Sequence, residues 1–305
     1  MKILVATEKP FSKAAVDKIR EVVRDSGNEF ALLEKYSDHQ ELVNTVKDAD
    51  ALIVRSDKVD AEVLNASEKL KIVVRAGAGY DNIDLDTASE KDIVVMNTPG
   101  QNSNAVAELG FGMMLYMNRN GFTPGTGTEL RGKKLGIHAY GYVGRIVGMI
   151  AKGFGMKVYA FDPFIDKVYI ENDGVKSEES AQDLYSKCQY VSVHIPANEK
   201  TRQSINYDLL KLMPRGATLI NTARKEVIHE DSLLKMFQIR EDFRYMSDIS
   251  PDCKAEIEKE YSGRYFFTSK KMGAQTAEAN LNAGLAAANQ IVKYFTDGDV
   301  QFKVN

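Results

Sequence analysis

The sequence predicts an α/β protein made of two doubly wound parallel-sheet domains with a cleft between them. Short apolar runs rich in β-branched residues alternate with amphipathic stretches along most of the 305 residues. The runs are continuously apolar, which is typical of parallel strands covered on both faces. The alternation also starts twice, at the N-terminus and again after residue 130, so two sheets are expected.

Each sheet is expected from its own set of apolar runs. The first set is KILVAT (2–7), EFALLEKY (29–36), ALIVRS (51–56), KIVVRAG (71–77) and DIVVMN (92–97). The second set is KLGIHA, KVYAFD, YVSVHI, ATLINTA and FRYMSDI, and a short aromatic strand follows at 265–268. Between the runs lie amphipathic stretches such as 13–25, whose apolar residues recur at helical spacing.

Two long helices rich in small residues separate the two sets. One covers roughly residues 104–116, and the other runs from about 275 to 295. The second helix would lead the chain back to the first domain. We therefore expect a discontinuous domain of residues 1–100 and 273–305, with residues 101–272 inserted as the other domain.

Composition excludes several classes of protein. The net charge is −3 with both signs interspersed, which does not favour nucleic acid or an anionic membrane as a partner. Cys188 and Cys253 show no pairing pattern, which suits a reducing compartment, and we expect no metal site. The N-terminal apolar run is too short for a signal peptide, and no stretch approaches membrane-span length. We expect a cytoplasmic protein.

The most specific motif is KKLGIHAYGYVGRIVGMIAKGFGMKVYAFD, residues 133–162. A strand enters a tight loop, a helix follows, and a second strand ends in Asp162. This is the dinucleotide fingerprint of a Rossmann-like domain, with Ala139 in place of the first glycine. The loop residues expected to bind the cofactor are Tyr140, Gly141, Tyr142, Val143 and Gly144.

Each part of this motif has a physical role. Gly141 allows the backbone to approach the pyrophosphate, and Gly144 allows the helix to pack close to the strand. The helix N-terminus offers N–H groups and a partial positive charge to the phosphates. Asp162 can accept hydrogen bonds from both ribose hydroxyls and would repel a 2′-phosphate, so the expected cofactor is NAD. Ala139 is the exception, because its Cβ disfavours a positive φ.

Long segments resemble the D-isomer-specific 2-hydroxyacid dehydrogenase family. IVRSDKVDAEVLNASEKLKIVVRAGAGYDNIDL and VVMNTPGQNSNAVAELGFGMM are similar to its substrate domain, and INTARKEVI resembles its catalytic-arginine segment. The resemblance covers nearly the whole chain. It implies NAD-linked oxidation of a D-2-hydroxyacid to the 2-keto acid. The expected substrate is 3-phosphoglycerate, at the start of serine biosynthesis.

The resemblance also implies a set of site residues. Arg224 matches the arginine that clamps the substrate carboxylate, for which a guanidinium fork is suited. Further cofactor-binding residues would be His194, Pro196, Thr201, Thr222, Asp248 and Gly273. The substrate-binding residues would be Arg55, Ser56, Arg75, Ala76, Gly77, Asn102 and Ser103.

Two residues depart from the family pattern. The acid–base histidine is replaced by Lys271, or by Lys270 if the register shifts by one, and Cys253 stands where the histidine's glutamate partner is expected. The two losses are consistent, since an ammonium needs no carboxylate to fix a tautomer. We expect Lys271 to donate the proton to the keto oxygen in reduction and, as the neutral amine, to accept it in oxidation.

The expected assembly is a homodimer, but residues 118–134 are shorter than the family's intersubunit arm, which puts cross-subunit help with a phosphate in doubt. No C-terminal regulatory domain is expected. Two alternatives stay open. One is a family member acting on glycerate, hydroxypyruvate or lactate, and the other is a non-enzymatic NAD-sensing interaction protein, which the missing histidine and glutamate would suit.

Overall fold

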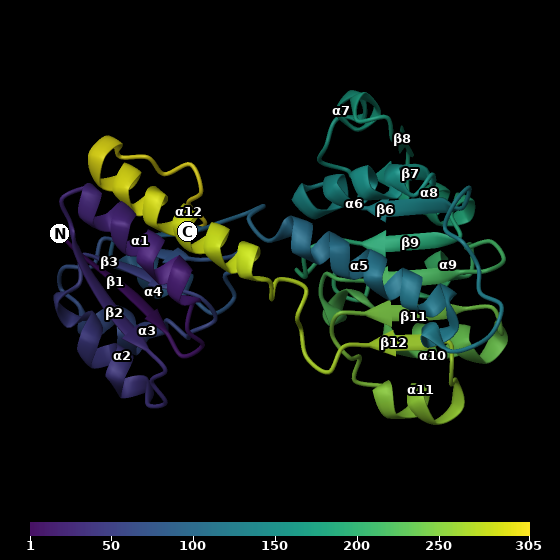
Figure 1. The fold of residues 1–305 in the computed structure, drawn as a ribbon, viewed down its shortest axis with the longest axis horizontal. Helices are drawn as coiled ribbons and strands as arrows, with labels where there is room; N and C mark the ends of the chain where they lie inside the picture. Colours follow the sequence, from purple (N-terminus) through teal and green to yellow (C-terminus); the bar gives the residue numbers. More distant parts are fainter. The chain divides into compact units, whose positions relative to one another are not determined.

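The computed structural model describes residues 1–305. The chain folds into two compact units (Figure 1). The N-terminal unit comprises Met1–Asn102 together with Ala274–Asn305, and the central unit comprises Ser103–Gly273. The roles expected for the two domains, and the cleft expected between them, stay predictions.

A five-stranded parallel sheet, in the order β2-β1-β3-β4-β5, forms the N-terminal unit. Each strand lies inside one of the five predicted apolar runs. The strands are β1 (Lys2–Thr7), β2 (Glu29–Glu34), β3 (Ala51–Val54), β4 (Ile72–Arg75) and β5 (Val94–Asn97). The parallel pairing confirms what their continuous apolar character predicted.

Helices cover both faces of this sheet. One face carries α1 (Lys13–Asp25) and α12 (Ala277–Asp297). The other carries α2 (His39–Thr45), the 3₁₀ turn η1 (Val46–Asp48), α3 (Ala61–Ala66) and α4 (Leu85–Glu90). Along β1 the side chains alternate between the two layers, as the pleat requires, so both faces of the strand are apolar and buried.

Helix α12 brings the end of the chain back to the first unit. It lies beside α1 (Figure 1). The two helices approach closely at Gly284, where an added Cβ would lie 2.6 Å from Ile19 Cδ1. The small residues that the sequence places along this helix therefore serve close packing within the N-terminal unit.

The central unit contains a seven-stranded parallel sheet in the order β12-β11-β10-β9-β6-β7-β8. Six strands match predicted runs, and the two-residue β8 does not. The strands are β6 (Lys134–His138), β7 (Lys157–Phe161), β8 (Lys176–Ser177), β9 (Tyr190–Val193), β10 (Thr218–Asn221), β11 (Arg244–Ser247) and β12 (Tyr265–Phe267).

Two helical layers enclose this sheet, each over its own apolar cluster. One layer is α5 (Ser103–Asn118), α6 (Tyr142–Gly153) and α7 (Lys167–Asn172). The other is α8 (Ala181–Lys187), α9 (Tyr207–Leu210), α10 (Glu230–Ile239) and α11 (Lys254–Glu260). Two 3₁₀ turns complete the unit, η2 (Asn120–Phe122) and η3 (Lys225–Val227).

None of the helices combines the length and the apolar character needed to cross a bilayer. Nowhere do three or more His, Cys, Asp or Glu side chains gather in a group that could hold a metal ion.

Candidate active site

The predicted cofactor and catalytic residues of the central unit follow the ends of its strands. Because the strands are all parallel, the loops after them lie at one edge of the sheet. Asp162 follows β7, the glycine loop follows β6, His194 follows β9, Arg224 follows β10 and Asp248 follows β11. The sheet order places these five loops side by side in that sequence, and the segment after β12 carries the two lysines.

The glycine loop has the geometry of a dinucleotide turn. Ala139 adopts φ 78°, so the alanine takes the left-handed conformation that favours glycine. A Cβ at Gly144 would lie 2.3 Å from the Ala139 carbonyl oxygen, so only glycine lets α6 approach the loop this closely. At Gly141 an added Cβ would meet nothing within 4 Å. Helix α6 has no side-chain cap, which leaves its first N–H groups for a ligand.

Asp162 faces this loop. Its Oδ2 accepts a hydrogen bond from Tyr140 N at 2.8 Å, and its Oδ1 accepts one from Phe164 N at 2.8 Å. Each carboxylate oxygen can accept more than one hydrogen bond. The carboxylate is therefore fixed in place and still able to receive two hydroxyl groups.

Tyr140 differs from the other loop residues. Its side chain is buried, and its hydroxyl donates to Asp173 Oδ2 at 3.2 Å. A Cβ at Gly148 on α6 would lie 3.2 Å from that hydroxyl, so the ring packs against the helix. Its backbone N–H is used by Asp162. Tyr140 shapes the loop, and no motif in the sequence indicated this packing.

His194 is held as a neutral ring. Its Nε2 lies 2.9 Å from Ser192 Oγ, and its Nδ1 lies 3.4 Å from Thr222 Oγ1. Burial, and to a smaller extent the neighbouring His138, lower the pKa of His194 to about 3. This histidine therefore cannot serve as a proton donor near neutral pH. The turn that follows it is closed by Thr201 Oγ1, which donates to Pro196 O at 2.5 Å.

Arg224 and Lys271 meet at one oxygen. Arg224 Nη1 donates to Ala223 O at 3.1 Å, and Lys271 Nζ donates to the same oxygen at 3.0 Å. Asn221 holds this short loop in place. Its side chain accepts a hydrogen bond from Ala223 N at 3.0 Å and donates one to Arg224 O at 2.9 Å. Asn221 is not among the site residues that the family resemblance implied.

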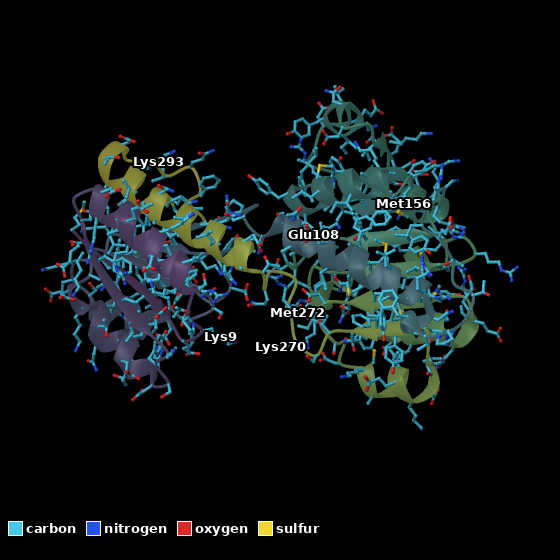
Figure 2. The ribbon with its side chains drawn as sticks, in the orientation of Figure 1. Lys9, Glu108, Met156, Lys270, Met272 and Lys293 are labelled. Atoms are coloured by element: carbon cyan, nitrogen blue, oxygen red, sulfur yellow. The ribbon has the colours of Figure 1, made fainter.

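The two lysines differ in their surroundings. Both are exposed, and they lie between β12 and α12, where Lys270 and Met272 are labelled in Figure 2. Lys271 reaches the loop of Arg224, whereas Lys270 makes no hydrogen bond or ion pair in the structure. Of the two lysines, only Lys271 therefore reaches the loop of Arg224, and its acid–base role stays a prediction.

Asp248 ties this segment to the sheet. Its Oδ1 accepts from Met272 N at 2.8 Å and its Oδ2 from Gly273 N at 2.9 Å. A Cβ at Gly273 would lie 2.6 Å from Asp248 Oδ2, so glycine is required for this contact. Burial raises the pKa of Asp248. The N–H groups of Met272 and Gly273 and the nearby Lys271 act in the opposite direction, because they stabilise the charged carboxylate, but burial has the larger effect. Cofactor binding by Asp248 and Gly273 stays a prediction, and what the structure adds is their role in holding the lysine segment.

Cys253 has none of the properties of an acid–base group. Burial and the nearby Glu230 raise the pKa of its thiol to about 12, so the thiol stays protonated. The Glu230 carboxylate accepts from Asp252 N and Cys253 N, both at 2.8 Å. The Glu230 carboxylate, which lies next to Cys253, is therefore bonded to backbone N–H groups.

The predicted substrate residues of the N-terminal unit lie at the end of β4 or in the segments that follow β3, β4 and β5. Arg75 Nε donates to Arg55 O at 2.9 Å, which joins the first two loops. The Arg75 guanidinium lies directly over Gly77, where a Cβ would be 1.4 Å from Nη1. Ser56 and Ala76 lie beside these residues in the same two loops. Asn102 and Ser103 fall at the boundary between the units, and Ser103 begins α5.

Comparisons with known proteins agree on one family. The model of the D-isomer specific 2-hydroxyacid dehydrogenase, catalytic domain, matches residues 5–305. D-3-phosphoglycerate dehydrogenase of Methanocaldococcus jannaschii is 35% identical over 268 residues, which are 83% of this chain and 51% of that protein. Hydroxypyruvate reductase of Thermotoga maritima is 34% identical over 284 residues, which are 86% of this chain and 90% of that protein.

A solved structure is more similar still. The crystal structure of NAD⁺-bound 3-phosphoglycerate dehydrogenase from Entamoeba histolytica is 48% identical, with a TM-score of 0.90, and the match covers 100% of this chain and 98% of that one. The chain spans about half the length of the first curated phosphoglycerate dehydrogenases that it matches. It belongs to the D-isomer specific 2-hydroxyacid dehydrogenase family.

Proposed function

We propose that this protein catalyses the NAD-dependent oxidation of D-3-phosphoglycerate to 3-phosphohydroxypyruvate and the reverse reduction, the first step of phosphorylated serine biosynthesis. One observation carries the proposal. Arg224 and Lys271 share the Ala223 carbonyl at the same sheet edge that bears the glycine loop and Asp162. A carboxylate clamp and a proton-transfer group thus lie on the edge where a dinucleotide binds in open α/β sheets.

The residues present fit NAD. The open side of Gly141, the uncapped start of α6 and the lone pairs of Asp162 suit a pyrophosphate and a ribose. When bound, NAD supplies the acceptor for the hydride that leaves carbon two of the substrate. The negatively charged Asp162 would face the position where NADP carries its 2′-phosphate. The two negative charges would repel each other, so NAD is favoured over NADP.

The chain's own residues would handle the carboxylate and the proton. The Arg224 guanidinium would bind the substrate carboxylate by two parallel hydrogen bonds. In oxidation the Lys271 amine would take the hydroxyl proton from the oxygen on carbon two. In reduction its ammonium would return that proton and offset the negative charge that develops on the keto oxygen. Because Nζ already reaches Ala223 O, a small rotation of a long, exposed side chain suffices to change its acceptor.

The purified chain tests the proposal directly. With NADH and 3-phosphohydroxypyruvate, the absorbance of NADH should fall, and kcat/KM should exceed that for hydroxypyruvate. No turnover with either substrate would contradict an enzymatic function and favour the interaction-protein alternative. Faster turnover of hydroxypyruvate would favour the second candidate, a hydroxypyruvate reductase like the Thermotoga maritima relative, which is 34% identical over 90% of its own length.

We further propose that the protein acts as a homodimer in the cytoplasm. The family resemblance supports the dimer. Within residues 118–134, Phe122 is 70% exposed, and we propose that it packs on the partner subunit. Light scattering on the purified chain should give twice the monomer mass, and Phe122→Ser should weaken that assembly.

A further inference from the structure

Tyr140 is bonded to the chain on both sides of α7. Its backbone N–H donates to Asp162 Oδ2 at 2.8 Å, just after β7, and its hydroxyl donates to Asp173 Oδ2 at 3.2 Å, just after α7. The residues between the two carboxylates, 163–172, contain α7, which packs beside the edge strand β8 (Figure 1). One residue of the glycine loop therefore holds both ends of this segment.

Asp173 also receives hydrogen bonds from both ends of α6. Its Oδ2 accepts from Arg145 Nε at 3.1 Å and its Oδ1 accepts from Arg145 Nη2 at 3.5 Å, near the start of the helix. Its backbone oxygen accepts from Lys152 Nζ, in the last turn of the same helix. Asp173 is thus fixed against the helix that begins at the glycine loop.

The Tyr140 hydroxyl depends on this carboxylate. The side chain is 1% exposed, and Asp173 is its only hydrogen-bond partner. Burial, and then the Asp173 charge, raise the pKa of Tyr140, so the hydroxyl keeps its proton and stays a donor. A buried hydroxyl without an acceptor is costly, so loss of Asp173 should shift the ring and with it the backbone N–H that Asp162 accepts.

Arg145 makes a second link between α6 and the α7 segment. Besides its bonds to Asp173, its Nη1 donates to Tyr169 OH, and its guanidinium lies 4.6 Å from the centre of the Tyr169 ring. The Arg145 side chain is 42% exposed, and partly exposed ion pairs of this kind add little stability by themselves. The importance of the Asp173 cluster therefore lies in the elements that it joins.

We propose that Asp173 is a positioning residue of the NAD site, which acts through Tyr140 and Arg145 to hold the glycine loop, the start of α6 and the Asp162 carboxylate in the arrangement that the cofactor needs. This inference rests on the proposed function for the use of NAD, but not for the identity of the substrate. Groups that are held in place before binding give higher affinity, because less conformational freedom is lost when the ligand binds.

The sign of the effect separates positioning from charge. NADH carries a negatively charged pyrophosphate, so by electrostatics alone removal of the Asp173 carboxylate would strengthen NADH binding. Positioning predicts the opposite, and Kd for NADH should rise about fivefold or more in Asp173→Ala. Tyr140→Phe changes no charge and should also weaken binding. The double variant should bind NADH about as weakly as Asp173→Ala, because both substitutions break the same hydrogen bond.

Tyr190→Phe is the matched control. Tyr190 is another buried tyrosine of the central unit, and its hydroxyl is bonded to Asn118 Nδ2 at 3.0 Å and to Asn118 Oδ1 at 3.1 Å. It lies at the amino end of β9, whereas the glycine loop follows the carboxyl end of the neighbouring β6. The control should lose stability as Tyr140→Phe does but bind NADH like the wild type. NADH fluorescence measures Kd without turnover.

Hydrogen exchange in the protein without cofactor gives a second readout. The amides of Tyr140 and Phe164 both donate to Asp162. They should exchange faster in Asp173→Ala and in Tyr140→Phe, since the segment that they close is then held less firmly. The same two amides should exchange at the wild-type rate in Tyr190→Phe.

The outcomes separate this inference from the proposed function. If the wild type binds NADH and the Asp173 and Tyr140 variants bind it as tightly or more tightly, the positioning role is wrong and the proposed function stands. An equal loss of affinity in Tyr190→Phe would reduce the effect to stability and would also overturn the positioning role. If the wild type does not bind NADH, both proposals fail.

Discussion

Lys271 and Arg224 donate hydrogen bonds to the same oxygen atom, the carbonyl of Ala223, at 3.0 and 3.1 Å. The two residues lie in different loops, after β12 and after β10. A shared acceptor brings an ammonium and a guanidinium together although their charges repel. A substrate that carries a carboxylate next to a keto oxygen offers each cation an acceptor of its own, and so it would relieve that repulsion.

Asp162 should determine which dinucleotide is used. In Asp162→Asn an NH₂ group replaces one carboxylate oxygen. This NH₂ donor then faces another donor, either Tyr140 N or Phe164 N, so one hydrogen bond is lost. KM for NADH should rise about tenfold or more, since a charge-assisted contact to the ribose is lost. The preference for NADH over NADPH should shrink, because the charge that repels a 2′-phosphate is gone. Steady-state kinetics with both cofactors measure this.

Asp208→Asn is the control for that variant, since Asp208 is 80% exposed and pairs only with Lys211. If Asp162→Asn discriminates between NADH and NADPH as the wild type does, the Asp162 carboxylate does not bind the ribose hydroxyls.

Gly273→Ala should displace the lysine segment. Its Cβ would lie 2.6 Å from Asp248 Oδ2, where the hydrogen bond from Gly273 N now forms. Since the same carboxylate holds Met272, Nζ of Lys271 should lose its fixed position, and kcat should fall about tenfold or more. NADH affinity, followed by fluorescence, should change less than kcat. Gly153→Ala, where a Cβ meets nothing within 4 Å, should leave kcat unchanged.

Buried histidines should make the protein acid-sensitive. Burial lowers the pKa of His138 to about 4 and that of His194 to about 3. Both would be near 6.5 in the unfolded chain. The unfolded state then binds more protons below about pH 6.5, so their contribution to stability is present above that pH and is lost as pH falls toward about 4.

From pH 7 to pH 5 each histidine should cost about 2 kcal/mol of unfolding free energy. Urea unfolding at the two pH values measures this. His194→Gln keeps a hydrogen-bonding side chain that does not titrate, and it should lose less stability on acidification than the wild type. An identical loss in both proteins would mean that His194 is not buried as a neutral ring.

Ala139 offers a stabilising substitution. Its φ of 78° disfavours any residue with a Cβ. Ala139→Gly should therefore raise the unfolding free energy by about 1 kcal/mol. The reverse sign is expected for Ala151→Gly inside α6, where glycine costs about 1 kcal/mol. Thermal unfolding measures both, and a lower Tm for Ala139→Gly would contradict the strain argument.

The fold could be predicted where a local pattern determines the structure. KILVAT reads as a buried parallel strand because all its residues are apolar or β-forming, and it is β1. The strand Lys176–Ser177 has no such pattern, since it exists only through pairing with β7. The fingerprint predicted the course of the loop at residues 139–144, because glycines at fixed spacing report close contacts within a few residues.

The site could be predicted less completely, because its contacts join residues far apart in the chain. The sequence left open whether Lys270 or Lys271 replaces the histidine. The position of Lys271 depends on Asp248, more than twenty positions earlier in the chain. Its carboxylate accepts hydrogen bonds from Met272 N and Gly273 N, just after Lys271. The backbone at Arg55 depends in the same way on Asp57, an acid that no motif marks, which accepts hydrogen bonds from Glu8 N and Arg55 N.

The proposed mechanism depends most on proton transfer by the amine of Lys271. Separate alanine substitutions at Lys271 and Lys270 test it most directly. With NADH and phosphohydroxypyruvate, Lys271→Ala should lower kcat at least a hundredfold, the usual contribution of a general acid. Lys270→Ala, at an equally exposed neighbour without a partner, should turn over at a rate close to that of the wild type. A Lys271→Ala enzyme with near-normal kcat in both reaction directions would contradict the account.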